Sequence, residues 1–121
     1  MIEGTTLVIG ASENKTRYSY LAVARLKAHH FPVIAFAKKA GIIEGTPIVT
    51  TLPQGEHIDT VTLYIGPQHQ PEYYDYLMQL HPRRIIFNPG TENTALKKLA
   101  EENGILAMEA CTLVLLSTGQ Y

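Results

Sequence analysis

The sequence predicts a three-layer, doubly wound α/β fold with a parallel sheet of about five strands. Short, mainly apolar runs such as residues 6–9 and 105–108 are typical of strands buried on both faces. Segments with helical spacing of apolar residues alternate with these runs along the chain. With 121 residues, 45% of them hydrophobic and 17% charged, the chain suits a single domain over residues 1–121.

The elements follow in order. Residues 6–9 predict a strand, and residues 19–29 predict a helix with Ser19 as its N-cap. Residues 32–36 predict a second strand, and this β-α-β unit indicates a right-handed crossover. Further strands are predicted at 47–49 (an edge strand), 60–65, 84–87 and 105–108, and further helices at 71–80, 92–103 (capped by Gly104) and 111–117.

Composition limits the partners. The net charge of −1 provides no broad basic surface, so no nucleic-acid partner is expected. No apolar run approaches the roughly 20 residues that span a bilayer, so no membrane partner is expected either. A single cysteine cannot form an internal disulfide, which suits a reducing compartment and predicts a cytoplasmic protein. A homodimer is compatible with a domain this small.

The loops that follow the predicted strands are the candidate ligand site. In doubly wound sheets, ligands bind outside the carboxyl ends of the strands. The loop after the first strand leads into a helix whose amino end suits a phosphate. Glycine and proline also punctuate ordinary turns, but several such loops on one edge favour a crevice. The residues predicted to bind a cofactor are Gly10, Ala11, Ser12, Lys15, Arg17, Ser19, Phe36, Lys38, Lys39, Gly66, Pro67, Asn88, Pro89 and Gly90.

The end of the second strand discriminates between cofactors. An NAD site usually has Asp or Glu there to accept from the ribose hydroxyls. This chain has Lys38 and Lys39 instead, which favour a ribose phosphate. The 3′-phosphate of coenzyme A and the 2′-phosphate of NADP both fit. The alternative is that the two lysines simply form a solvated loop.

Several of these residues match a known family. Residues 8–12 (VIGAS) and 17–20 (RYSY) resemble the Gly-x-Ser and Arg-x-Ser phosphate-loop pattern of stand-alone CoA-binding domain proteins. These are small bacterial Rossmann-like proteins, similar to the CoA-binding part of the succinyl-CoA synthetase alpha subunit. Gly45, residues 58–61, residues 103–105 and Cys111 match as well. The chain departs from the family at residues 37–39, where Asn-Pro is usual, and at Thr112, where proline is usual.

The resemblance implies a cleft for the ADP part of coenzyme A or an acyl-CoA. The first loop would act as a phosphate-binding loop for the pyrophosphate, and the turns at 66–67 and 88–90 would flank the ligand. NADP is the less favoured cofactor, because a hydride-transfer enzyme would need a further substrate pocket. A third interpretation is an interaction domain that kept the fold without the ligand.

No catalytic set of side chains is evident, so the sequence favours a binding module over an enzyme. The histidines lack cysteine or acidic neighbours at ligand spacing, so no metal site is predicted. Cys111 is expected to be a buried structural thiol. The alternative is a reactive thiol at the start of the last helix, able to form a mixed disulfide with the CoA thiol.

Overall fold

A computed structural model of the chain describes residues 4–121. The strands are β1 (Thr5–Ile9), β2 (Val33–Phe36), β3 (Gly41–Ile43), β4 (Thr46–Val49), β5 (Ile58–Leu63), β6 (Arg84–Phe87) and β7 (Leu106–Glu109). The helices are α1 (Tyr18–Ala28), α2 (Tyr74–Leu80), α3 (Thr94–Glu102) and α4 (Thr112–Ser117), with short 3-10 turns η1 (Pro67–His69) and η2 (Pro71–Tyr73) ahead of α2.

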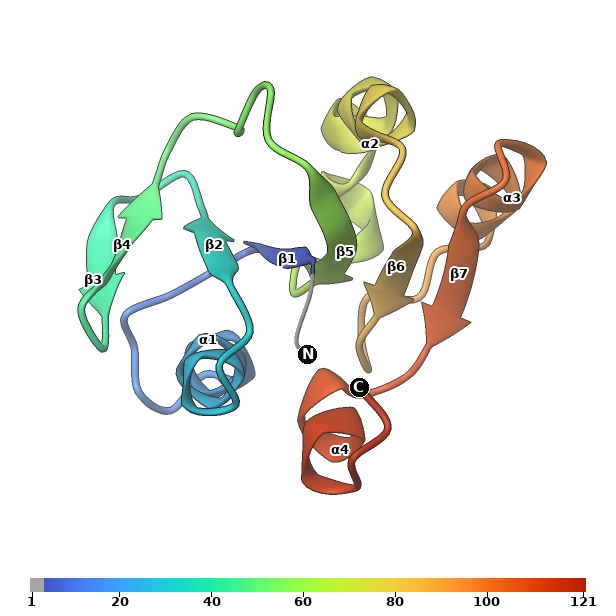
Figure 1. Ribbon diagram of the computed structural model, residues 1–121. Helices are drawn as coiled ribbons and strands as arrows, with labels where there is room; N and C mark the ends of the chain where they lie inside the picture. The colour runs from blue at the N-terminus through green and yellow to red at the C-terminus, as the bar shows by residue number, and fades with distance from the viewer. Residues whose placement is uncertain (1–3) are drawn as a thin grey trace.

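The strands form one sheet in the order β3-β4-β2-β1-β5-β6-β7 (Figure 1). Every neighbouring pair is parallel except β3 and β4, which form an antiparallel hairpin. Helices α1 and α4 lie on one side of the sheet, and α2 and α3 lie on the other (Figure 1). The three-layer, doubly wound prediction is therefore confirmed.

The predicted count of about five strands is wrong, because the sheet has seven. The edge strand predicted at 47–49 is β4, but β3 lies outside it and forms the edge. Glu44 and Gly45 join the two strands with φ angles of 48° and 80°. Two successive positive φ values are the pattern of a type I′ hairpin turn, whose twist matches that of the paired strands.

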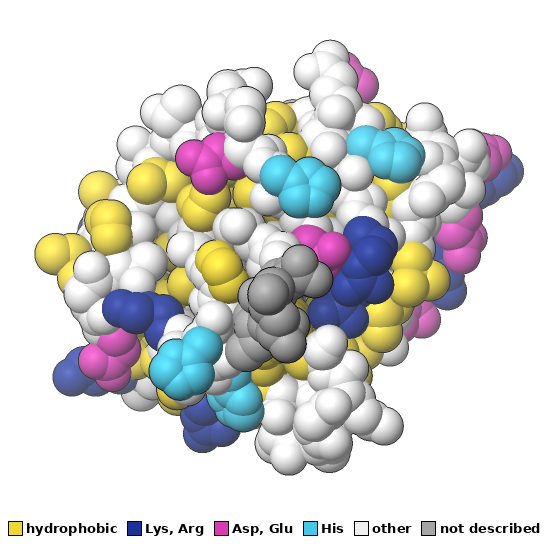
Figure 2. Space-filling model, in the orientation of Figure 1, with side chains coloured by type: hydrophobic (Ala, Val, Ile, Leu, Met, Phe, Trp, Pro, Cys, Tyr) yellow, Lys and Arg dark blue, Asp and Glu magenta, His cyan; other side chains and the backbone are white. Residues whose placement is uncertain are grey.

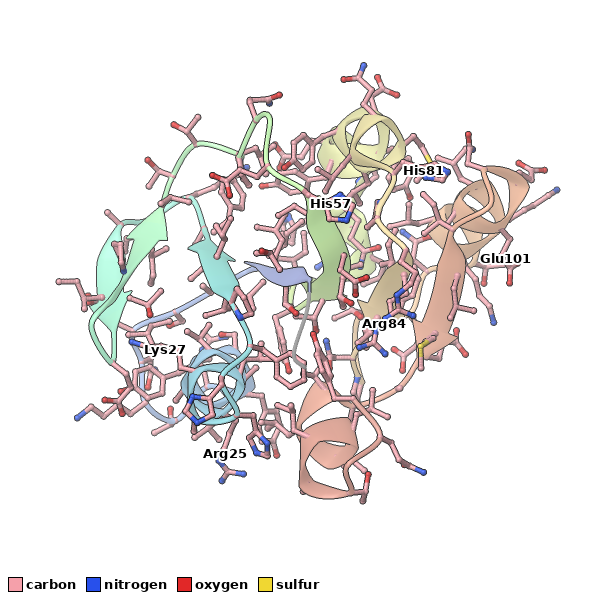
Figure 3. The ribbon with its side chains drawn as sticks, in the orientation of Figure 1. Arg25, Lys27, His57, His81, Arg84 and Glu101 are labelled. Atoms are coloured by element: carbon pink, nitrogen blue, oxygen red, sulfur yellow. The ribbon has the colours of Figure 1, made fainter. Side chains whose placement is uncertain are left out.

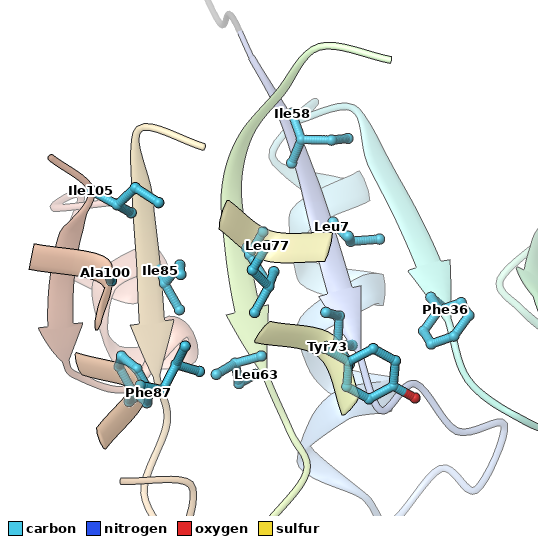
Figure 4. Packing of buried hydrophobic residues seen from close by; sticks show 13 residues of the cluster. Leu7, Phe36, Ile58, Leu63, Tyr73, Leu77, Ile85, Phe87, Ala100 and Ile105 are labelled. Atoms are coloured by element: carbon cyan, nitrogen blue, oxygen red, sulfur yellow. The ribbon is translucent and has the colours of Figure 1, made fainter. Parts of the chain in front are cut away.

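The core has two parts because both faces of the sheet are covered. One part packs α2 and α3 against the sheet and includes Leu7, Leu63 and Ile85 (Figure 4). The other packs α1 and α4 against the opposite face, through residues such as Val8 and Val23. Successive residues of β1 thus point to different clusters, as the alternation of side chains along a strand requires.

The helix starts differ from the prediction. The helix predicted from residue 71 begins with the 3-10 turn η2, and α2 itself begins at Tyr74. The N-cap of α1 is Arg17 rather than Ser19, because a turn built on Asn14 ends one residue before Tyr18: the Arg17 amide donates to the Asn14 carbonyl at 3.0 Å. The cap of α3 is Asn93, whose side chain accepts from the Leu96 amide at 3.1 Å. The predicted Gly104 cap is confirmed, with φ 75° and the Gly104 amide bonded to the Glu101 carbonyl.

The surface carries basic and acidic side chains side by side. On the face drawn in Figure 2, Lys and Arg form small separate groups next to Asp and Glu. Within residues 4–121, no helix has both the length and the apolarity needed to cross a membrane.

Candidate functional site

The order in which the chain adds strands to the sheet reverses between β1 and β5. From β1 the chain builds β2, β3 and β4 on one side, and it then returns to build β5, β6 and β7 on the other. In open parallel sheets, ligands bind outside the carboxyl ends of the strands at this switch point. The segments that meet there are the loop after β1, the turn after β2 and the turn after β5.

Gly10, directly after β1, must be a glycine because the chain leaving β5 lies close to it. Its φ is 98°, which disfavours any other residue. A Cβ atom there would lie 2.8 Å from both the Tyr64 carbonyl oxygen and the Ile65 Cγ2. The glycine therefore permits close approach of the chain leaving β5. The structure gives it this packing role whether or not a ligand also approaches.

The loop between β1 and α1 already uses several of its amides. Those of Gly10 and Ala11 both donate to the Phe36 carbonyl, at 3.0 and 3.1 Å. The Asn14 amide donates to the Ser12 hydroxyl, and the Thr16 amide donates to the Asn14 side chain. The first two bonds attach the start of the loop to the end of β2, and the other two lie within the loop. A phosphate near this loop would therefore depend on the lysine side chains more than on the amides of Gly10 and Ala11.

One cleft, here called the outer cleft, has a volume of about 540 Å³. It lies between the loop after β1 and the β3–β4 hairpin. Lys15 lines it from the loop, and Lys39 lines it from the turn after β2. Exposed ammonium groups from two separate segments make this cleft suitable for an anion. Its lining residues are Ala11, Ser12, Glu13, Asn14, Lys15, Tyr20, Lys39, Ala40, Ile42 and Ile48.

A second cleft of about 420 Å³, the inner cleft, lies at the switch point itself and shares Lys39 with the outer cleft. Its wall is mainly apolar. The Phe36 and Tyr73 rings, which both line it, meet edge to face with their centroids 5.8 Å apart (Figure 4). Its lining residues are Ile9, Gly10, Phe36, Ala37, Lys38, Lys39, Ile65, His69, Glu72 and Tyr73.

An ion pair crosses the rim of the inner cleft. The Lys38 ammonium donates to a Glu72 carboxylate oxygen at 2.8 Å, and both side chains are more than half exposed. The hydrogen bond and the charge of Glu72 raise the pKa of Lys38, so the ammonium stays charged at neutral pH. Such an exposed pair stabilises the fold little and can exchange for a ligand anion.

The two clefts bring together half of the predicted site: Gly10, Ala11, Ser12, Lys15, Phe36, Lys38 and Lys39. The other predicted residues line neither cleft. Arg17 is exposed at the start of α1, whereas Ser19 is buried with a relative exposure of 4%. Gly66 is the N-cap of η1 and Pro67 is its first residue, whereas Pro89 and Gly90 form an exposed turn after β6.

Asn88 and Cys111 also lie outside the two clefts. The Asn88 side chain is buried and bonded to the main chain at Leu63 and Thr112. Cys111 is a half-buried N-cap of α4, outside both clefts.

Several cleft residues were not predicted, among them Glu13, Ile42, His69, Glu72 and Tyr73. Ile42 belongs to β3, the strand missed from the sequence. Its signal was the sequence Glu44-Gly45 between two short apolar segments, which suits a two-residue hairpin loop. His69, Glu72 and Tyr73 reach the inner cleft from the turns before α2, so only the packing of that segment brings them to β1 and β2.

No metal centre is evident in the described part of the chain, where no three His, Cys, Asp or Glu side chains gather as ligands. Figure 3 shows His57 beside β5 and His81 at the end of α2. His81 has a structural partner, since its Nε2 lies 2.7 Å from the Asn103 carbonyl oxygen. Arg84 lies at the opposite end of the sheet from the clefts, with its guanidinium 4.5 Å from the centre of the Tyr121 ring.

Comparison with family models identifies the chain. A model described as a CoA binding domain matches residues 4–117. The chain belongs to this CoA-binding domain family. The match includes every element from β1 to α4, so both clefts lie within the CoA-binding domain.

Solved structures share the fold of this CoA-binding domain. A crystal structure of an uncharacterized protein superposes with a TM-score of 0.95 at 45% identity, and the two chains cover each other completely. A hypothetical protein from Pyrococcus horikoshii OT3 has a TM-score of 0.85 at 21% identity, with coverage of 93% of this chain and 81% of that one. A Thermus thermophilus structure has a TM-score of 0.85 at 18% identity, with coverage of 98% and 90%. No curated protein matches the chain.

Proposed function

We propose that this protein is a small binding module for coenzyme A or an acyl-CoA, which it holds through the phosphates of the ADP moiety at the outer cleft. The observation that carries the proposal is the pair Lys15 and Lys39, which line one cleft at the carboxyl edge of a sheet from the CoA-binding domain family. Lysines from two loops can contact two phosphate groups of one ligand.

The shape of the site supports this assignment. Each cleft lies within the range of about 300–1,000 Å³ common for small-molecule sites. Lys39 belongs to both, so one elongated ligand can place its phosphates in the outer cleft and an uncharged portion against the apolar inner cleft. Lys38 adds a further cation once Glu72 is displaced. The lack of an acid at the end of β2 argues against NAD.

Two alternatives share this geometry. The lysines after β2 also suit the 2′-phosphate of NADP, and the same fold could serve as an interaction domain without a cofactor. A panel of coenzyme A, dephospho-coenzyme A, NADP, NAD and ADP in thermal unfolding separates the three, because a ligand that binds only the folded state raises Tm. The largest Tm increase should come from coenzyme A. A larger increase with NADP favours the dinucleotide, and no increase with any ligand favours the interaction domain.

Lys39→Ala tests the site directly. Loss of a charge-assisted contact should weaken the Kd for coenzyme A about tenfold or more, measured by isothermal titration calorimetry. Lys98→Ala is the matched control, because Lys98 is an exposed lysine on α3, outside both clefts. Equal affinities for the parent protein and Lys39→Ala would reject the outer cleft as the phosphate site.

A further inference from the structure

Glu13 crosses from the loop after β1 to the edge strand β3. Its Oε2 accepts a hydrogen bond from the Ile42 amide at 3.1 Å. Its side chain lies directly over Gly41, where an added Cβ would be 2.6 Å from Glu13 Cδ and 2.8 Å from Oε2. Gly41 does not have a left-handed φ, so its backbone conformation does not require glycine. The absence of a side chain at Gly41 leaves the space that the Glu13 side chain occupies.

This carboxylate is held on the rim of the outer cleft. Glu13 and Ile42 both line the cleft, together with Lys15 and Lys39. A ligand phosphate bound by these lysines would share the cleft with a fixed negative charge. Like charges in one cleft repel, so the Glu13 carboxylate weakens phosphate binding unless it moves. The single exposed hydrogen bond to Ile42 allows that movement at small cost.

A purely structural role of Glu13, in which it only protects the edge strand, would not require a negative charge. Ile42 belongs to an edge strand, and edge strands present amides that need an acceptor or protection. A neutral acceptor would satisfy the Ile42 amide as well as a carboxylate does. Protection of the edge strand does not explain why a negative charge lines the same cleft as Lys15 and Lys39.

We propose that Glu13 is an autoinhibitory strap, which binds the Ile42 amide in the ligand-free protein and is released when an anionic ligand enters the outer cleft. The strap is an internal anion that competes with the ligand phosphate for the space beside Lys15 and Lys39. It rests on the proposed function in one respect, namely that the phosphates of the ligand occupy the outer cleft. Gly41 is the second part of the device, because it provides the surface on which the strap lies.

Two variants separate the effect of the Glu13 charge on ligand affinity from the effect of its position. Glu13→Gln keeps an acceptor for the Ile42 amide but removes the charge, and should tighten the Kd for coenzyme A by about three- to tenfold. Gly41→Ala keeps the charge but displaces the strap, and should give a smaller tightening. The new methyl group meets mainly the movable end of the Glu13 side chain, so folding should be retained. Glu101→Gln on α3 removes the same charge far from the cleft, and should leave the affinity unchanged.

Whether the two variants bind coenzyme A more tightly or more weakly than the parent protein decides the proposal. If the strap instead helps to build the binding site, Glu13→Gln and Gly41→Ala will weaken binding or leave it unchanged, and either result overturns autoinhibition. Both variants are first compared with the parent protein in urea unfolding. A change in Kd is interpreted only for a variant that unfolds cooperatively.

Release of the strap can also be observed without coenzyme A. Inorganic pyrophosphate should move the Ile42 amide proton shift, measured by NMR, toward its position in Glu13→Ala, where the acceptor is absent. If pyrophosphate does this and coenzyme A does not bind, the strap stands and the proposed function fails. If coenzyme A binds and the Ile42 shift stays in place, the function stands and the strap fails. An Ile42 shift unchanged by both ligands overturns the strap.

Discussion

Asn88 shows how a single side chain organises the edge of the sheet on which the clefts lie. Its Nδ2 donates to the Thr62 hydroxyl at 2.6 Å and to the Leu63 carbonyl at 2.8 Å, and its Oδ1 accepts from the Thr112 amide at 2.9 Å. One amide thus joins the end of β5, the end of β6 and the start of α4. The residue predicted to flank a ligand is, in the structure, bonded to the protein itself on every side.

Asn88→Ala should therefore lower the free energy of unfolding by about 2–4 kcal/mol, because it leaves a buried carbonyl and a buried amide without partners. Chemical denaturation in urea measures the effect. Asn103→Ala, which removes one exposed bond to the Leu99 carbonyl, should cost less than about 1 kcal/mol. Equal losses in the two variants would mean that the Asn88 network contributes little to stability.

Asp59 gives a prediction about pH. Two hydrogen bonds from Arg83, at 2.9 and 3.1 Å, are the main cause that lowers the pKa of Asp59 below its ordinary value. A carboxyl group with a lower pKa in the folded state stabilises the fold above its unfolded pKa, about 3.9. That contribution disappears as the pH falls through the folded pKa.

Arg83→Gln should thus lower the free energy of unfolding at pH 7 by about 0.5–1 kcal/mol, a small value because Arg83 is largely exposed. Below the folded pKa of Asp59, where its carboxyl group is protonated in both states, the variant and the parent protein should be equally stable. Urea unfolding from pH 2.5 to 7 tests this. A difference that stays constant with pH would assign the loss to packing of the Arg83 side chain.

At the scale of elements, the sequence predicts what is buried better than what is at an edge. The central strands β1, β5 and β6 follow from short apolar runs, because strands covered on both faces need them. Strand β3 has only three residues, one of them a glycine, and its exposed Ile42 gives no alternation to detect. The start of α1 depends on the turn at Asn14, whose hydrogen bonds pair residues in a way that propensity does not specify.

The candidate site was predictable to the extent that it follows strand ends. Lys38 and Lys39 come directly after β2, so their place at the carboxyl edge follows from the strand alone. Glu13 and Glu72 need tertiary information, since one reaches β3 and the other pairs with Lys38 from a distant segment. The sequence located the edge, while packing decided which side chains face the clefts.

His30 provides a prediction about one helix end. It follows α1 with a φ of 66°, its amide donates to the Lys27 carbonyl, and the Phe31 amide donates to the Leu26 carbonyl. This left-handed C-terminal cap normally has glycine. His30→Gly should raise the free energy of unfolding by about 0.5–1 kcal/mol in urea unfolding. His29→Gly, at a φ of −89°, should instead destabilise the protein. A loss of stability in His30→Gly would contradict this account.

At the scale of the whole molecule, the outer cleft lies where this chain lacks a helix that the doubly wound fold usually has. Without β3, the strand order is the doubly wound order of a dinucleotide-binding fold. In that fold a helix usually connects parallel strands, but here the chain passes from β2 to β4 through the turn at Lys38 and the short strand β3. A right-handed crossover would place that helix beside α1, on the side of the sheet where α1 and α4 lie, and Figure 1 shows no further helix there next to β3 and β4. The hairpin therefore forms one wall of the outer cleft, opposite the loop after β1.

This arrangement predicts how ligand binding responds to salt, because the lysines of the clefts are exposed. Raising NaCl from 0.1 to 1 M shortens the Debye length from about 10 to about 3 Å. The affinity for coenzyme A, measured by titration calorimetry, should fall several-fold over that range. Lys39→Ala should show a shallower decline, since one screened contact is already lost, whereas Lys98→Ala should keep the slope of the parent protein. An affinity independent of salt would show that apolar contacts, rather than the lysines, hold the ligand.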